Sequence, residues 1–476
     1  MGQAAIYSME QDCEIARREL FREECHSQLD IFLDALEPQL TQANPTLEEL
    51  TAVIFSRRHE LMGQLVSSFV KQAHADLIAQ QFTTCPLCEK LLKARSTHPR
   101  TVETMVGTIS VERPYFYCVS CQQGFYPLDL ALNLSPRQKQ TDIQKAACRL
   151  AAEIPYQTSD ELFHELTGLC LSDHTIHDMV AEVSGQLTLL DVLPSDQQVH
   201  DQIAELAEDK TWRPIMVLAI DGAQVPIRPE EAKGTRPGPK KQRARRAHWQ
   251  GQWQEAKGFR LYLVDGERII HLASWHQIQT HEQLAEALRS CKAHGLIPEA
   301  LVRLCVIADG ARWIWELAKE LFPSAVEVLD FYHCSEHISK VAVVQYPHDT
   351  ERQQHWAESV IVRLMMNEGE SVIWGLQHMK PPSEQASAEI TKLINYLHTH
   401  IERINYKSFR KGAYPIGSGG IESSNKFICH VRLKRSGAWW YVGKANDMLA
   451  LRCAKYNGTF DRLFEKKTPE PHIKNA

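Results

Sequence analysis

Apolar positions recur along this chain with two different periods, which predicts helices and strands in separate regions. From residue 8 to about residue 81, apolar residues lie three or four positions apart, as on one face of a helix. Asn44-Pro45 interrupts this pattern, and Thr46 with Glu49 has the spacing of a capping box. We therefore predict two long helices. Their acidic side is interpreted as a solvated face, and a helical arm for dimerisation is the alternative.

Continuous apolar runs in the second half of the chain predict buried strands. The first run covers residues 217–225, and two more cover residues 301–308 and 325–329. Between them lie strand patterns at 253–264 and 268–273 and helical patterns at about 280–294 and 312–321. Strands that alternate with helices in this way indicate a mixed sheet covered on both faces.

Residues 140–190 predict three short helices, with Thr167-Gly168 as a turn. This arrangement is typical of a helix-turn-helix, and a plain helical bundle is the alternative. Candidate DNA-reading residues open the third helix: His174, Thr175 and His177. Residues 191–211 are polar and acidic, and we predict a linker there.

The length and the cysteine content limit the class of protein. A chain of 476 residues is too long for one simple core and predicts two to four domains. No run of 18 apolar residues occurs, so no membrane span is expected, and the first residues lack a secretory pattern. Thirteen cysteines, four of them in two tight pairs, favour metal binding and free thiols in a reducing compartment. A cytoplasmic location is therefore expected.

Charge is distributed unevenly, although the net charge is only −6. Residues 403–467 carry fourteen Lys and Arg against four Asp and Glu, and residues 233–246 carry seven Lys and Arg with no acid. A DNA backbone responds to such local potential, and a solvated loop is the alternative for residues 233–246. The candidate DNA-contacting residues in the two regions are Lys240, Lys241, Arg243, Arg245, Arg246, Lys426, Arg432, Lys434, Arg435, Trp439 and Trp440. Core packing is the alternative for the two tryptophans.

Two CxxC pairs predict a zinc site. Cys85 and Cys88 form the first pair, and Cys118 and Cys121 form the second. Residues 101–111 between them alternate as strands do, with Gly107 at a turn. Four thiolates at the ends of a β-hairpin describe a zinc ribbon that holds one structural Zn²⁺. Four unrelated buried cysteines are the alternative.

Three carboxylates occupy positions suited to a second metal site. Asp221 ends the apolar residues 217–220 of the first run and precedes Gly222, where the backbone can turn. Asp309 closes a later run, and Glu422 opens a helical pattern. Oxygen ligands of this kind suit two Mg²⁺ ions, with Mn²⁺ also possible, which assist phosphodiester displacement. For either aspartate alone, a turn or cap residue is the alternative.

The motifs around these residues resemble the DDE transposases of bacterial insertion sequences, in the Mutator-like group and closest to its Kra-type branch. The resemblance covers roughly residues 80 to 455 and rests on Asp330-Phe331-Tyr332-His333, on Gly417 to Lys426, and on Val431 to Trp440. It implies that Asp221, Asp309 and Glu422 are the three catalytic carboxylates. Asp330 and His333 match an Asp-x-x-His signature, while Cys334 and His337 also fit a Cys-x-x-His variant, so the register stays open.

The resemblance implies a multidomain α/β protein with a ribonuclease-H-like mixed sheet and an all-helical insertion. The expected order is a helical arm (1–81), a zinc ribbon (82–135), a helix-turn-helix (136–190), a linker (191–211), the first part of the catalytic core (212–333), the helical insertion (334–411), and the final helix with a basic C-terminus (412–476). The expected partners are double-stranded DNA, as element ends and target, and a second copy of the chain in a homodimer or larger assembly.

The implied reaction is metal-assisted hydrolysis of DNA at the element end, followed by joining of the 3′-hydroxyl to target DNA. Two other classes are weighed against this DDE transposase. A DNA-binding regulator derived from such an enzyme would need only the zinc ribbon and the helix-turn-helix. A structure-specific ribonuclease-H-like nuclease would lack a use for the separate DNA-binding modules.

Overall fold

The protein is a mixed α/β chain that divides into two compact units. The computed structural model describes residues 2–40, 44–208, 210–229 and 250–465. One unit comprises residues 1–179 with 464–476, and the other comprises residues 180–463. Within the described residues, no helix is both long enough and apolar enough to cross a membrane.

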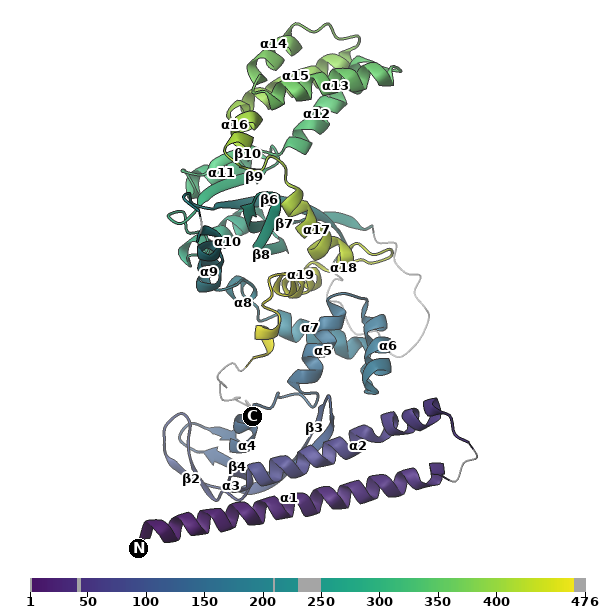
Figure 1. Ribbon diagram of the computed structural model, residues 1–476, viewed down its shortest axis with the longest axis vertical. Helices are drawn as coiled ribbons and strands as arrows, with labels where there is room; N and C mark the ends of the chain where they lie inside the picture. The colour runs from purple at the N-terminus through teal and green to yellow at the C-terminus, as the bar shows by residue number, and fades with distance from the viewer. Residues whose placement is uncertain (1, 41–43, 209, 230–249, 466–476) are drawn as a thin grey trace. The chain divides into compact units, whose positions relative to one another are not determined.

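The N-terminal unit begins with two long helices, as the sequence predicts. Helix α1 (Gly2–Leu40) lies along helix α2 (Leu47–Ala73), and the short α3 (Ala75–Ile78) follows (Figure 1). The capping box is present, because the Thr46 side chain accepts from the Glu49 N–H while the Glu49 carboxylate accepts from the Thr46 N–H. Lys71 of α2 binds Glu24 of α1 at 2.5 Å, which ties the two helices together.

A small β region and four short helices follow, and the last of these helices, α7, continues into the second unit. Strands β1 (Phe82–Thr84) and β2 (Leu91–Lys93) pair antiparallel, and β3 (Ser96–Thr104), β4 (Gly107–Cys118) and β5 (Gln123–Phe125) form an antiparallel sheet. The helices are α4 (Pro127–Ala131), α5 (Thr141–Ala151), α6 (Tyr156–Thr167) and α7 (Asp173–Ser184). Gly168 ends α6 at a φ of +74°, a left-handed conformation that suits glycine, so the predicted turn is present.

The segment predicted as a linker, residues 191–211, is largely helical instead. Helix α8 (Leu189–Val192) is followed by α9 (Asp196–Ala207), which starts with a capping box between Ser195 and Gln198. Val199 and Ile203 of α9 are buried against the sheet of the second unit. The linker prediction was wrong because two apolar residues four positions apart suffice for docking, while the remaining polar residues dominate the composition.

The second unit is built on a five-stranded sheet with the order β10-β9-β6-β7-β8. Strands β6 (Ile215–Ile227), β7 (Gln252–Asp265) and β8 (Arg268–Ile278) pair antiparallel in sequence. Helix α10 (His281–Ala293), β9 (Arg303–Ala308), α11 (Arg312–Leu321) and β10 (Val326–Leu329) follow, and β9 and β10 run parallel to β6. The predicted sequence of strands and helices is therefore present.

The two faces of this sheet are covered by different elements. Met216, Leu218 and Ile220 of β6 belong to a large apolar cluster that also contains residues of α9, α10 and α11. The alternate β6 positions, Val217 and Ala219, pack instead with Ile421 of helix α17 (Gly419–Asn425). Because side chains alternate between the faces of a strand, Asp221 lies on the face that α17 covers.

A helical insertion separates β10 from α17. It comprises α12 (Phe331–Gln345), α13 (Thr350–Met365), α14 (Gly369–Gln377), α15 (Glu384–Thr399), η1 (Ile401–Ile404) and α16 (Tyr406–Lys411). The insertion begins and ends at one place on the sheet, since the Phe331 N–H donates to the Ile416 carbonyl at 2.9 Å. Figure 1 shows these helices as a group at one end of the sheet.

The final helical segment is interrupted rather than continuous. After α17 comes a π-helical turn, η2 (Lys426–His430), then α18 (Val431–Leu433), α19 (Val442–Tyr456) and η3 (Asp461–Phe464). Between α18 and α19 the chain returns to the sheet, where Trp440 bridges Ile227 at the end of β6. The π-helical turn begins four residues after Glu422, and such turns are often found at functional sites.

Candidate functional site

Neighbouring strands bring three aspartates into one row. Ile220 of β6 and Leu329 of β10 both pair with Ala308 of β9 in parallel register. Each of these three residues is followed in the chain by an aspartate: Asp221 within β6, Asp309 after β9 and Asp330 after β10. Because adjacent residues in register point to the same face, the three aspartates line one edge of the parallel strands, on the face covered by α17.

The sequence suggested that Asp221 lies at the end of its strand, but β6 continues beyond it to Ile227. The parallel pairing of β6 with β9 stops at Ile220, but the antiparallel pairing with β7 continues from Asp221 to Ile227. Gly222 is therefore a strand residue rather than a turn residue. The space that a side chain at position 222 would fill is occupied by Glu255, whose Oε1 lies 2.2 Å from the place of a Cβ on Gly222. The consequence is that β6 is paired on both sides up to Ile220, whereas Asp221 is paired with β7 alone.

The Asp221 carboxylate is half-buried and has two hydrogen-bond donors. The Gly222 N–H donates to its Oδ1, and Asn425 Nδ2 donates to its Oδ2, both at 2.7 Å. Burial raises the pKa of Asp221 to about 6, and the negative charges of Asp309 and Glu255 add to this. The Gly222 hydrogen bond and the positive charge of His333 oppose the shift. These influences place Asp309 and His333 in the electrostatic surroundings of Asp221.

Asp330 has a different environment, although it stands in the same row. Its side chain is fully buried, and it accepts hydrogen bonds from the His333 N–H, from His333 Nδ1 and from the Ser418 N–H. Burial would raise its pKa, but the hydrogen bonds outweigh burial and hold the pKa below its ordinary value. Because its oxygens face protein donors, Asp330 joins the start of α12 to the turn before α17.

His333 carries a positive charge next to the aspartates. Its hydrogen bond to Asp330 raises the pKa of the imidazole to about 9, with smaller contributions from the charges of Asp221 and Asp309. The alternative pair lies elsewhere: Cys334 is buried, and the ring of His337 stacks on Tyr396 with 4.3 Å between centroids. Geometry therefore favours the Asp330 and His333 register over the Cys334 and His337 register.

Helix α17 brings Glu422 to the same face of the sheet. Arg260 donates to the Gly420 carbonyl at 2.5 Å, the hydroxyls of Ser274 and Ser424 bond at 2.8 Å, and Asn425 reaches Asp221. Glu422 is half-buried and lies three residues before Asn425, hence on the same side of the helix. A Cβ on Gly420 would lie 2.8 Å from the Tyr262 ring, so glycine permits this close packing.

The three carboxylates do not form a compact cage in this conformation. Among the described residues, the four cysteines are the only group of three or more candidate ligands whose ligand atoms all lie within 4.8 Å of one another. Asp309 and Glu422 thus share the face with Asp221 at wider spacing. Asp309 Oδ1 accepts from the Ala311 N–H at 2.9 Å, which leaves its other oxygen available as a ligand.

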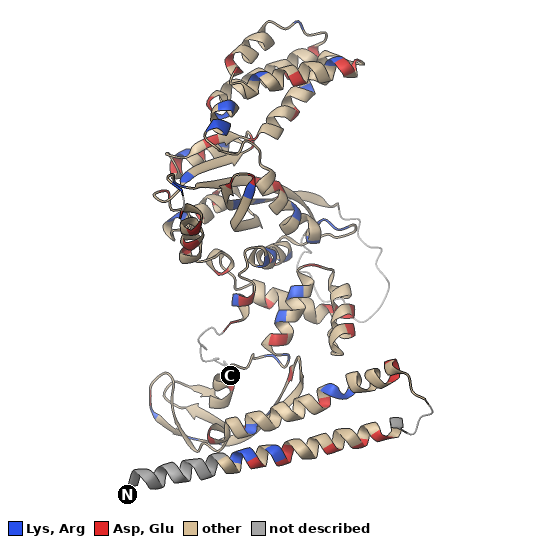
Figure 2. Cartoon of the chain, in the orientation of Figure 1, with Lys and Arg blue, Asp and Glu red and all other residues tan. Residues whose placement is uncertain are grey.

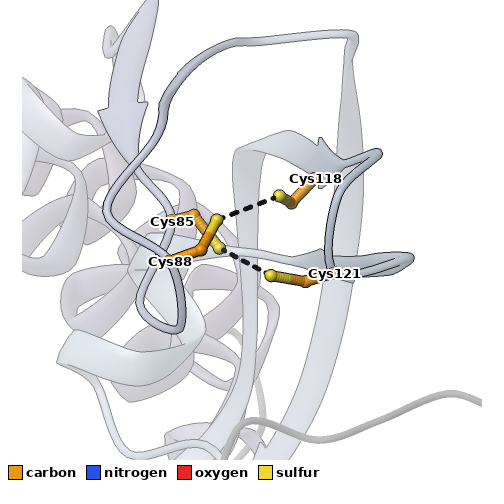
Figure 3. A group of neighbouring side chains, drawn as sticks. All are labelled: Cys85, Cys88, Cys118 and Cys121. Carbon is orange, nitrogen blue, oxygen red and sulfur yellow. Dashed lines mark hydrogen bonds between the residues drawn. The ribbon is translucent and has the colours of Figure 1, made fainter.

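The four predicted zinc ligands lie together (Figure 3). Cys85 and Cys121 are 3.9 Å apart, sulfur to sulfur, and Cys88 and Cys118 are 3.6 Å apart. Four thiolates around a tetrahedral zinc with Zn–S bonds of 2.3 Å would be separated by about 3.8 Å. Disulfide sulfurs are much closer, at about 2.05 Å. The cluster therefore fits a metal such as zinc.

Electrostatics of the cluster supports the same reading. The backbone N–H of Cys121 is the main cause that lowers the pKa of Cys118 to about 7. By contrast, the hydrogen bond with Cys88 is the main cause that raises the pKa of Cys121 to about 12. One thiolate forms readily, and accumulating more negative charge without a cation is costly.

The predicted DNA-contacting residues differ in their exposure. His174 is 92% exposed, whereas Thr175 is half-buried and bonds the Ser172 hydroxyl at 2.9 Å. His177 lies against Tyr156, with 5.6 Å between ring centroids. The basic residues Lys240, Lys241, Arg243, Arg245 and Arg246 lie outside the described residues.

In the C-terminal segment, part of the predicted DNA set is buried. Arg432 and Trp440 are inside the protein, where the guanidinium lies 4.9 Å from the indole and Trp440 Nε1 donates to the Leu433 carbonyl. These two residues support the fold. Lys426 and Arg435 are exposed, and Trp439 is 38% exposed beside Trp253. Figure 2 shows further Lys and Arg on α16 and α19.

Sequence reasoning missed two residues of this site, Asn425 and His276. Asn425 stands one helical turn after Glu422, so a search of the same helix face for polar residues could have found it. His276 carries no local signal, because its place beside the site depends on how β8 pairs with β7.

Comparison with known proteins yields a family match over most of the chain. A family model described as "Uncharacterised protein family (UPF0236)" matches residues 46–468. A curated relative, the "UPF0236 protein in vanSb 3'region" of Streptococcus gallolyticus, is 20% identical over 438 residues, which is 90% of this chain and 88% of the relative. Among solved structures, the "Drosophila P element transposase strand transfer complex" is similar with a TM-score of 0.26 and 12% identity, over 71% of this chain and 83% of that chain. A likeness at that score carries no argument about function.

Proposed function

This chain belongs to the UPF0236 family, and we propose that it is a metal-dependent DNA transposase of the DDE class. The observation that carries the proposal is the row of aspartates at the place where the parallel pairing of adjacent strands ends, with Glu422 presented by a helix across the same face. Acidic residues gathered at one edge of a sheet are costly unless they serve a cation. Burial is the main cause of the raised pKa of Asp221, and the charge of Asp309 adds to it.

The arrangement of the sheet supports a ribonuclease-H-like core. Three antiparallel strands are followed by two that run parallel to the first, and helices cross between them. This order puts the first and fourth strands side by side, so that residues 88 positions apart in sequence become neighbours. The Mutator-like assignment and its Kra-type branch remain proposals that rest on the motifs around Asp330 and Glu422.

Each residue of the site has a distinct role in this proposal. Asp221, Asp309 and Glu422 would supply the oxygen ligands for two Mg²⁺ ions. When bound, such ions would stabilise charge on the attacking and leaving oxygens of the phosphodiester. His333 adds a cation beside the carboxylates and suits contact with a DNA phosphate. Asp330 orients His333 and holds the turn that leads into α17.

The reaction has two steps of the same kind. Water attacks a phosphodiester at the element end, the 3′-oxygen leaves, and a 3′-hydroxyl remains. That hydroxyl then attacks a target phosphodiester, which forms a new phosphodiester, while the 3′-oxygen of the target strand leaves and is protonated to a hydroxyl. No protein nucleophile becomes covalently attached in either step.

The N-terminal unit would recognise DNA. The four cysteines would hold one Zn²⁺ that stabilises the β region, and α7 would enter the major groove with exposed His174 near its start. Double-stranded DNA and a second copy of the chain are the proposed partners, because two element ends must be held together before joining.

The test is the substitution Asp221→Asn in a plasmid-nicking assay with Mg²⁺ or Mn²⁺. It keeps the shape of the residue and removes a charged ligand, so nicking should stop while DNA affinity stays. The matched control is Asp265→Asn, which removes a 41% exposed aspartate on the same sheet that pairs with Lys210. The control should nick normally. Nicking by Asp221→Asn at the wild-type rate contradicts the proposal. If the wild type and both variants bind DNA and none of them nicks it, the result favours the DNA-binding regulator instead.

A further inference from the structure

We infer that Asn425, supported by His276, is a positioning residue that fixes the orientation of the Asp221 carboxylate for metal binding. This inference rests on the proposed function and deepens it. It assigns roles to two buried residues outside the motif of three carboxylates.

The first observation is a row that crosses three strands. Asp221 pairs with Gly258 of β7, and Gly258 pairs with His276 of β8. Side chains in such a row share one face. A Cβ on Gly258 would lie 2.3 Å from His276 Cδ2, so the imidazole occupies the space that a side chain at 258 would fill. The glycine lets the ring extend from β8 across β7 towards Asp221.

The second observation concerns the amide of Asn425, which covers this row. Its side chain is 5% exposed, and its Nδ2 donates to Asp221 Oδ2 at 2.7 Å. The other end of the amide, Oδ1, is buried and has no hydrogen-bond partner among the described residues. A buried carbonyl oxygen without a donor is costly, so an adjacent donor should be used.

His276 is the adjacent donor. Its ring is fully buried, and neither ring nitrogen makes a well-formed hydrogen bond within the described residues. Burial lowers its pKa to about 4, while the neighbouring Asn425 side chain acts in the opposite direction. The imidazole is therefore neutral at physiological pH and carries one N–H. A small rotation joins that N–H to Asn425 Oδ1.

The direction of this chain of bonds decides the function of the amide. With His276 donating to Oδ1, the amide nitrogen must face Asp221. The reversed amide would put two oxygens against each other. Each Asp221 oxygen then keeps one lone pair free for a cation, because one donor serves each oxygen. The same helix carries Glu422, so the bond also fixes the distance between two proposed ligands.

The experiment compares Asn425→Ala with the matched control Ser424→Ala. Ser424 is the preceding residue of α17, and its buried hydroxyl bonds Ser274 rather than Asp221. For each full-length protein, calorimetry with MnCl₂ alone gives the Mn²⁺ affinity, and plasmid nicking gives the Mn²⁺ concentration for half-maximal rate. Second-sphere partners of metal ligands typically contribute 10- to 100-fold in affinity. Asn425→Ala should therefore need about 10- to 100-fold more Mn²⁺, and saturating Mn²⁺ should restore most of the rate.

A merely structural role for Asn425 would lower the melting temperature and the maximal rate without moving the Mn²⁺ dependence. His276→Phe provides a second route if Asn425→Ala does not fold, since phenylalanine keeps the ring and removes the donor. It should shift the Mn²⁺ dependence in the same direction by a smaller factor, whereas Ser424→Ala should not shift it. An active wild type with an unchanged Mn²⁺ dependence in the variants overturns this inference alone. A wild type that neither binds Mn²⁺ nor nicks DNA overturns the proposed function as well.

Discussion

The raised pKa of Asp221 makes the stability of the second unit depend on pH in a specific direction. A shift from 3.8 to about 6 means that ionising this carboxylate costs more in the folded state than in the unfolded state. The cost is absent below about pH 4, grows as the pH rises towards 6, and is complete above it. At about 1.4 kcal/mol for each pH unit, it amounts to roughly 3 kcal/mol at most.

Asp221→Asn removes this cost and should stabilise the protein at pH 8 when no divalent metal is added. The amide has one acceptor oxygen in place of two, so it cannot accept equally well from both Gly222 and Asn425. This loss destabilises the folded state by about 1 kcal/mol. The expected net gain is about 2 kcal/mol, or roughly 4–8 °C in melting temperature for a unit of this size. At pH 4.5 the carboxylate is already protonated, so the gain should vanish or reverse.

The assay is a pair of thermal melts, wild type and variant, at both pH values in buffer without added divalent metal. Adding Mg²⁺ at pH 8 should raise the wild-type melting temperature and leave the variant unchanged, because only the wild type gains from binding. A variant that is destabilised equally at both pH values would refute the claim that Asp221 is held at an electrostatic cost. Stabilisation of both proteins by Mg²⁺ would refute its role as a ligand.

Three other predictions follow from the geometry of the two sites. Protein purified under reducing conditions should contain one equivalent of zinc, and Cys118→Ser should lose the metal together with the fold of the β region; a wild type without zinc in elemental analysis would rule this out. Asp330→Ala should cost about 2–4 kcal/mol in urea unfolding, because it leaves buried donors unpaired, whereas Asp309→Ala should cost less than about 1 kcal/mol; equal losses would show that Asp330 is no more structural than Asp309. His333→Gln should lose most stability below pH 6.5 and progressively less as the pH rises through 9. The reason is that the raised pKa of His333 contributes stability only while the ring is protonated. A loss of stability that is independent of pH would contradict the ion pair between His333 and Asp330.

Elements with strong periodicity could be predicted closely from the sequence. Helix α11 has the predicted bounds, Arg312–Leu321, because its apolar residues form a regular stripe. The meeting of the two cysteine pairs could also be predicted, because a hairpin between two CxxC turns is enough to bring them together. In these cases the information lies within a short stretch of chain.

The sequence was less informative where a property depends on pairing between distant segments. The apolar run predicted as a strand reaches residue 225, but nothing near Asp221 indicates that β6 extends past the end of β9 and pairs with β7 alone up to Ile227. The same holds for His276, which reaches the site only through the register of β8 and the glycine at 258. Helix α9 was missed for another reason, namely that Val199 and Ile203 are too few to mark an apolar face.

The closed path of the helical insertion bears on how relatives of this protein can be recognised. The chain leaves the sheet at Asp330 and returns at Ser418, and these two residues are hydrogen-bonded to each other. Helices added or deleted far from those anchor points would leave the two ends of the insertion joined at the sheet. We therefore expect relatives to differ in the length of the interval between Asp309 and Glu422. A search for distant relatives should accordingly use the short words that flank the anchors and treat the interval between them as variable.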